Sequence, residues 1–80
     1  MEIDNLVRMA NRIGHFFEAW PNHAEAVAGV QEHVAKFWET RMRRQIYAHL
    51  DAGGSGLSDL LFEALNAGRA RLCPDPKQLQ

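Results

Sequence analysis

Four histidines and one cysteine are the residues that most readily suggest chemistry, since both types bind metals and cysteine is also a nucleophile. The histidines fall on different predicted helices or turns. No two of them form an HxxxH pair, and none is spaced from Cys73 as a zinc ligand would be. Cys73 lies in a proline-flanked segment where no base is held nearby. The spacing favours a surface thiol and solvated or edge histidines, namely His15, His23, His33 and His49.

A glycine-rich segment and a carboxylate pair are the other candidates for chemistry. Residues 53–56 read Gly-Gly-Ser-Gly, but a P-loop needs a strand before it and GK[ST] after it, and neither is present. Asp59 and Glu63 are four residues apart on the exposed side of a predicted helix, with no predicted cleft around them. The glycine segment is therefore typical of a helix connector, and acid–base catalysis has no support.

The strongest local charge is the run Arg41-Met42-Arg43-Arg44, in a chain whose net charge is −1. A nucleic-acid patch of this length, without a second basic cluster, is weakly supported. A solvated helix start is also an imperfect explanation, because cations are unfavourable near a helix N-terminus. The third interpretation is contact with carboxylates, either internal ones such as Glu39 or those of a partner protein. The residues leave all three open.

Large apolar side chains are more numerous than one small core comfortably covers. Met9, Phe16 and Trp20 lie along one edge of the first predicted helix, where core packing is the simpler explanation. Phe37 and Trp38 close the apolar stripe of the second helix, so at least one of them is expected in the core. Because Trp, Phe, Met and Arg are enriched in interfaces, we expect some of this surplus to contact a protein. The predicted partner-binding residues are Met9, Phe16, Trp20, Trp38, Arg41, Arg43 and Arg44.

The elements that carry these residues are predicted from apolar spacing. Residues 3–20 form a first helix, which Pro21 ends. Asn22 is an N-cap for a second helix that starts near His23. Continuing that helix would bury Arg41 without a partner, so a break is predicted near Glu39 and Thr40, the latter a possible N-cap.

Two further helices follow this break. The third covers residues 41–50, and the glycine-rich loop ends it. The fourth begins after Ser58 as N-cap and runs to about Ala67, with Gly68 ending it. Residues 1–68 are predicted to be a single helical domain, and residues 69–80 a flexible C-terminal tail that contains Pro74 and Pro76. The predicted fold class is all-α, a small bundle of about four short helices.

The totals of the chain add limits on stability and location. A core of this size rarely supplies more than ~3–5 kcal/mol, and a single cysteine excludes an intramolecular disulfide. No apolar run approaches the ~20 residues of a membrane span, and the acidic first residues lack the basic start of a secretory signal. The chain is predicted to be cytoplasmic, with no membrane partner.

Several segments in combination resemble the delta subunit of soluble NAD-dependent formate dehydrogenase over about Ile3 to Leu65. The family usually has a proline where this sequence has Thr40. The segments that carry the resemblance are Ile3-Asp4-Asn5-Leu6-Val7-Arg8-Met9-Ala10-Asn11-Arg12-Ile13-Gly14, Phe16-Phe17, Phe37-Trp38 with Arg41-Met42-Arg43, and Gly53-Gly54-Ser55-Gly56-Leu57-Ser58.

The resemblance implies a bacterial cytoplasmic complex that oxidises formate to carbon dioxide and reduces NAD⁺. Its other subunits are implied to carry a molybdenum or tungsten bis-pterin centre, iron–sulfur clusters, FMN and the NAD site, and this chain no cofactor. The implied role is non-catalytic: binding the large catalytic subunit and supporting its assembly, stability or cofactor insertion. Two alternatives remain, a small helical nucleic-acid-binding regulator and a helical protein that self-associates through its apolar edge.

Overall fold

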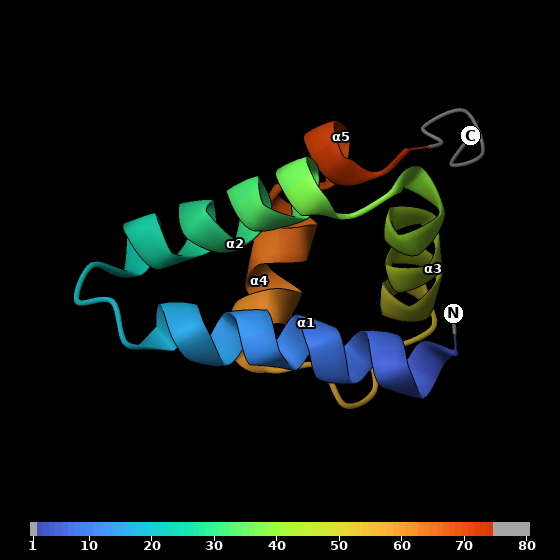
Figure 1. Ribbon diagram of the computed structural model, residues 1–80, viewed down its shortest axis with the longest axis horizontal. Coiled ribbons are helices and arrows are strands. Elements are labelled where there is room, and N and C mark those ends of the chain that lie inside the picture. The colour runs from blue at the N-terminus through green and yellow to red at the C-terminus, as the bar shows by residue number, and fades with distance from the viewer. Residues whose placement is uncertain (1, 75–80) are drawn as a thin grey trace.

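The computed structural model describes residues 2–74, and within them the chain is helical with no strand (Figure 1). The predicted all-α fold class is confirmed. Four helices have nine or more residues, and a fifth is a single turn. In chain order they are α1 (Ile3–Glu18), α2 (His23–Phe37), α3 (Thr40–Asp51), α4 (Asp59–Ala67) and α5 (Arg69–Leu72).

Helices α1 and α2 run side by side in opposite directions (Figure 1). Helix α1 ends at Glu18, two residues before the predicted end. The side chain of Asn22 accepts a 2.9 Å hydrogen bond from the backbone N–H of Glu25, which begins α2 as predicted. Helix α2 ends at Phe37, and Trp38 has extended backbone angles, so the predicted break is confirmed. Thr40 is the first residue of α3 rather than its N-cap.

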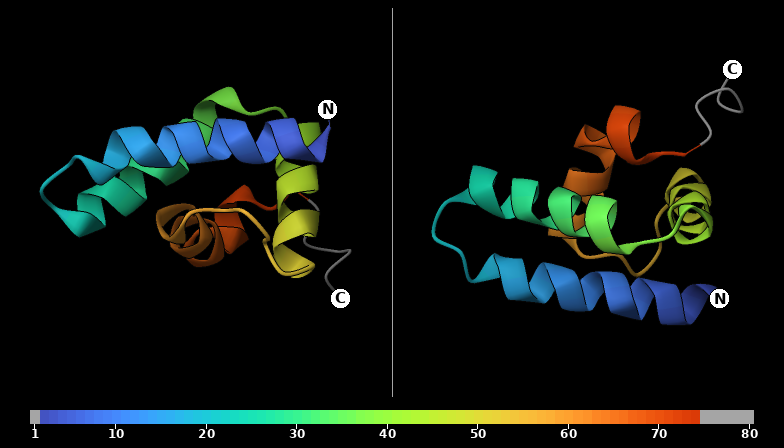
Figure 2. Two further views of the ribbon diagram at one scale, coloured as in Figure 1. Left: turned by 90° about the horizontal axis from the view of Figure 1, so that it is seen from below. Right: turned by 45° about the horizontal axis from the view of Figure 1, so that its top comes forward.

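Helix α4 packs against both α1 and α2, whereas α3 stands across the end of the pair where the N-terminus lies (Figures 1 and 2). The close approach of α1 to α4 depends on Gly14, because a Cβ there would lie 2.4 Å from Cδ2 of Leu61.

Tyr47 is buried and donates a 2.6 Å hydrogen bond to the carbonyl of Leu65. Burial raises the pKa of Tyr47 to about 12. The fully buried apolar side chains are Leu6, Ala10, Val30, Val34, Ile46, Leu61, Ala64, Leu65 and Leu72.

The glycine-rich connector between α3 and α4 is attached to α1 by one side chain. Asn11 donates a 2.8 Å hydrogen bond from Nδ2 to the carbonyl of Gly56, and its Oδ1 accepts one of 2.8 Å from the N–H of Ser58. Gly53, Gly54 and Gly56 all have positive φ, which L side chains rarely adopt. The loop is therefore the predicted connector, and Asn11 fixes where it enters α4.

The sequence predicts that the folded part ends at residue 68. This prediction is wrong, because the next four residues are also helical. Residues 69–72 form α5, which lies beside α2, and Leu72 is fully buried (Figure 2). Arg71 forms a 2.6 Å ion pair with Glu32 of α2, and Arg69 forms one of 2.6 Å with Asp51 of α3. Sequence periodicity missed this turn because a single buried leucine has no repeat. Residues 75–80 of the predicted tail lie outside the described residues.

Candidate functional site

The surface has an apolar hollow between α1 and α2. One part has a volume of about 520 Å³, and a second part of about 300 Å³ shares Phe16, Phe17 and His33 with it. We call the two together the α1–α2 groove. The first part is lined by Met9, Arg12, Ile13, Phe16, Phe17, His33 and Trp38, and the second adds Trp20, Gly29, Glu32, Lys36 and Phe37.

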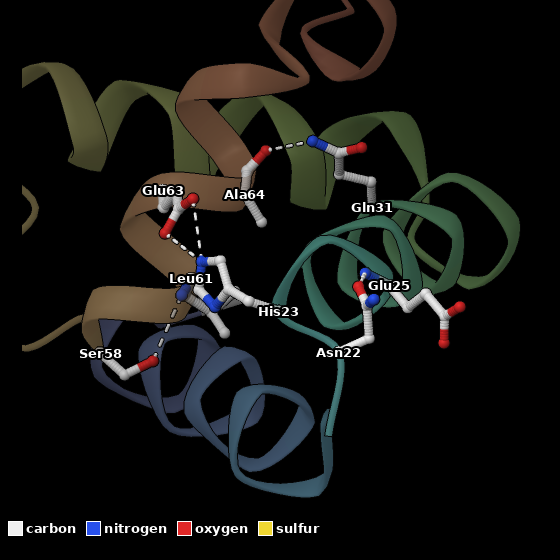
Figure 3. A network of polar contacts seen from close by, with 8 residues as sticks. All are labelled: Asn22, His23, Glu25, Gln31, Ser58, Leu61, Glu63 and Ala64. Atoms are coloured by element: carbon white, nitrogen blue, oxygen red, sulfur yellow. Dashed lines mark hydrogen bonds and ion pairs between the residues drawn. The ribbon is translucent and has the colours of Figure 1, made fainter. Parts of the chain in front are cut away.

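The groove lies on the side of the helix pair away from α4. Side chains advance by about 100° per helical residue, so Phe16 points away from Gly14, which packs on α4. By the same count His33 points away from Gln31, whose side-chain amide donates a 2.9 Å hydrogen bond to the α4 carbonyl of Ala64 (Figure 3). The described helices therefore cover one face of the α1–α2 pair and leave the groove face open.

The floor of the groove is built from two buried aromatic rings. Phe17 is 9% exposed and lies against Gly29, where a Cβ would be 2.4 Å from the ring. Trp38 is 5% exposed, and its extended backbone follows the end of α2. The absence of a side chain at Gly29 thus gives Phe17 its place between the helices. Trp38, predicted as an anchor for a partner, is part of the core and contributes the floor.

The two sides of the groove carry exposed aromatic side chains. Phe16 on α1 is 63% exposed and Phe37 on α2 is 69% exposed, while Trp20 is 40% exposed. Phe16 and Trp20 each meet the ring of Phe17 edge-on, at centroid distances of 5.0 and 4.9 Å. These contacts hold large apolar surfaces in defined positions before any partner binds. Four of the seven predicted partner-binding residues line the groove, namely Met9, Phe16, Trp20 and Trp38.

The charges at the groove are mostly positive. Arg12 lies on the α1 side and Lys36 on the α2 side, and neither forms an ion pair with any residue of 2–74. The carboxylate of Glu32 is hydrogen-bonded to Arg71, which lowers its pKa, with a smaller effect from Lys36. Because Arg71 neutralises Glu32, the cations of Arg12 and Lys36 are the uncompensated charges of the groove.

The three predicted arginines of α3 are not part of this groove. Arg41 and Arg44 are exposed. Arg43 is half-buried, and its guanidinium donates to the carbonyl of Leu72 at 3.4 Å and to the Thr40 hydroxyl at 3.5 Å. Arg43 therefore has a role inside the chain, holding the end of α5 against α3. Partner contact by these arginines stays a prediction.

Two of the histidines that suggested chemistry join different segments of the fold. His23 of α2 contacts both carboxylate oxygens of Glu63 in α4, at 2.9 and 3.1 Å (Figure 3). His49 contacts the carbonyl of Ser55 at 2.7 Å, within the α3–α4 connection. In the described part of the chain, no group of three or more His, Cys, Asp or Glu residues could hold a metal ion. Nor does any helix there have the length and apolar character needed to cross a bilayer.

Comparison with known proteins identifies a family that this chain matches. The model of a protein family described as NADH-dependent formate dehydrogenase delta subunit FdsD matches residues 5–65 of this chain. No curated protein and no solved structure matches significantly. The matched segment runs from α1 through most of α4, so it contains every residue of the α1–α2 groove.

Proposed function

Because the chain belongs to the family of NADH-dependent formate dehydrogenase delta subunits, we propose that it is a non-catalytic accessory subunit. It binds the large catalytic subunit of the enzyme and supports the assembly, stability or molybdenum-cofactor insertion of that subunit. The observation that carries the proposal is the open α1–α2 groove within the matched segment, where Phe16 and Phe37 are more than 60% exposed. Two phenylalanines exposed beside a groove add nothing to the stability of a chain that acts alone.

The use of the polar side chains supports the non-catalytic part of the proposal. Of the histidines and carboxylates that suggested chemistry, His23 and Glu63 are engaged with each other across two helices. A general base or a metal ligand needs a free lone pair directed at a substrate or an ion. We therefore assign the molybdenum or tungsten bis-pterin, the iron–sulfur clusters, FMN and the NAD site to other subunits of a cytoplasmic complex.

The groove also supports protein binding over nucleic-acid binding. Its lining is mainly apolar and aromatic, the composition found at the centre of protein interfaces. Of the basic run in α3, Arg43 is already committed to the Leu72 carbonyl, which leaves a smaller cationic surface for phosphates. A steep loss of DNA affinity with rising salt would favour the nucleic-acid alternative, whereas an accessory subunit has no appreciable DNA affinity at any salt concentration.

Co-purification tests the proposal directly. The tagged full-length chain is isolated from its native cell, and the proteins recovered with it are identified by mass spectrometry. We expect the large formate dehydrogenase subunit in stoichiometric amount, and its absence would refute the proposed function. The matched variant carries Phe16→Ser and Phe37→Ser, which removes two exposed side chains and leaves the buried core unchanged. We expect this variant to stay folded by circular dichroism and to lose the large subunit.

A further inference from the structure

We propose that the α1–α2 groove binds an amphipathic helix of the partner, about three turns long, with an apolar stripe flanked by Asp or Glu. This inference rests on the aromatic lining of the groove, together with Arg12 on its α1 side and Lys36 on its α2 side. Only the identity of the partner, the large subunit, rests on the proposed function. The chemistry of the bound segment rests on the groove.

The shape of the groove fits a helix. Its α1 side extends over twelve residues, from Met9 to Trp20, of which all but the last two lie in the helix. At 1.5 Å per residue this is roughly 16 Å, or about three turns of a helix laid alongside. A peptide in β-strand conformation binds by adding to a sheet edge, and residues 2–74 contain no strand to accept it. A helix satisfies its own backbone and needs only an apolar surface, which Phe16 and Phe37 provide.

The charges define what flanks the apolar stripe. Arg12 and Lys36 lie on opposite sides of the groove, and the carboxylate of Glu32, which also lines it, is paired with Arg71. Guanidinium and ammonium groups at an interface rim are complemented by carboxylates, which form the stronger, charge-assisted hydrogen bonds. Past Trp20 the surface turns acidic with Glu18, Asp59 and Glu63. The acidic residues of the bound helix must therefore lie beside Arg12 and Lys36 and away from Glu18, Asp59 and Glu63.

The same charges disfavour a second copy of this chain as the occupant. A two-fold dimer brings the same patch of each copy together, so the groove would face another groove. Each copy would bring the uncompensated cations of Arg12 and Lys36, and the like charges would repel in a surface being removed from water. An acidic partner helix replaces this repulsion with attraction.

Photo-crosslinking within the assembled complex identifies the occupant. The tagged full-length chain carries p-benzoylphenylalanine in place of Phe16 or Phe37, is expressed in its native cell and is irradiated after purification of the complex. Exposed Ala48 on α3, which does not line the groove, is the control position. We expect both groove positions, and not the control, to crosslink to one segment with apolar residues at i, i+3, i+4 and i+7 and neighbouring Asp or Glu.

The outcomes separate the two proposals. A crosslink to a second copy, to a segment without carboxylates, or no crosslink from either groove position while the large subunit co-purifies would overturn the inference and leave the proposed function standing. A crosslink to an acidic amphipathic helix of some other protein, with no large subunit recovered, would overturn the proposed function and support the groove chemistry.

Charge exchange supplies a second, independent measurement. Arg12→Glu with Lys36→Glu is expected to weaken binding of the captured segment, as a synthetic peptide, at least tenfold in a fluorescence titration at low salt. The matched variant Arg12→Lys with Lys36→Arg keeps both charges and is expected to stay within about threefold of the original. Equal affinity of the peptide for the charge-reversed and original chains would refute the assigned role of these cations.

Discussion

Replacing Leu72 with alanine tests whether α5 is part of the folded unit. The side chain is fully buried, although it lies four residues beyond the predicted end of the domain. The change removes three carbon atoms at about 0.8 kcal/mol each, and the cavity that remains brings the expected loss to about 3 kcal/mol. For a domain of this size each kcal/mol lowers Tm by roughly 4–8 °C. A decrease of at least about 12 °C is therefore expected.

Urea unfolding followed by tryptophan fluorescence measures this loss, since Trp38 is only 5% exposed and reports on the core. Total stability is expected to be ~3–5 kcal/mol, so Leu72→Val, with a loss of about 1 kcal/mol, provides a variant that stays folded. Arg71→Ala is the control, because it removes only an exposed ion pair worth less than about 1 kcal/mol. A loss below 0.5 kcal/mol for Leu72→Ala, by the scale of ~2–5 kcal/mol for buried leucines, would refute the packing of α5.

Three further predictions concern the connector, the groove floor and pH. Asn11→Ala removes both hydrogen bonds to the glycine-rich loop, and urea unfolding should show a loss of about 1–3 kcal/mol. Gly29→Ala forces the Phe17 ring to shift; the overpacking cost of ~1–3 kcal/mol exceeds the helix-propensity gain of at most ~1 kcal/mol, so Tm should fall. The pKa of Tyr47 is raised to about 12 in the folded chain. The protonated phenol therefore stabilises the fold fully below pH 10. The free energy of unfolding should decrease from pH 10 to 12. Tyr47→Phe should abolish that decrease.

The local features of the fold could be predicted from sequence because their causes are local. An asparagine followed three residues later by its hydrogen-bond donor begins α2, and a proline limits α1. The break after α2 was predicted from the cost of burying Arg41, and the structure places the extended residue at Trp38. In each case the deciding interaction spans only a few residues of the chain.

Long-range contacts could not be predicted in this way. Leu72 is buried by elements distant in sequence, and nothing in the residues around it repeats with helical spacing. Asn11 resembles any exposed polar residue of a helix until the loop 45 residues later meets it. Arg43 belongs to a conspicuous basic run, yet it is the carbonyl of Leu72 that gives this arginine its partner.

The groove illustrates the same distinction between local pattern and spatial arrangement. Phe16 and Phe17 are adjacent in sequence, and both read as apolar residues of one helix. Gly29 determines which of the two is buried. The Phe17 ring packs against Gly29 and forms the floor of the groove, whereas Phe16 stays exposed at its edge. The interface candidate that the sequence made most conspicuous, the basic run, is partly occupied within the chain. The better-supported surface depends on a glycine, which no pattern of charge or aromatic residues would have identified, so a test of partner binding should begin at the groove.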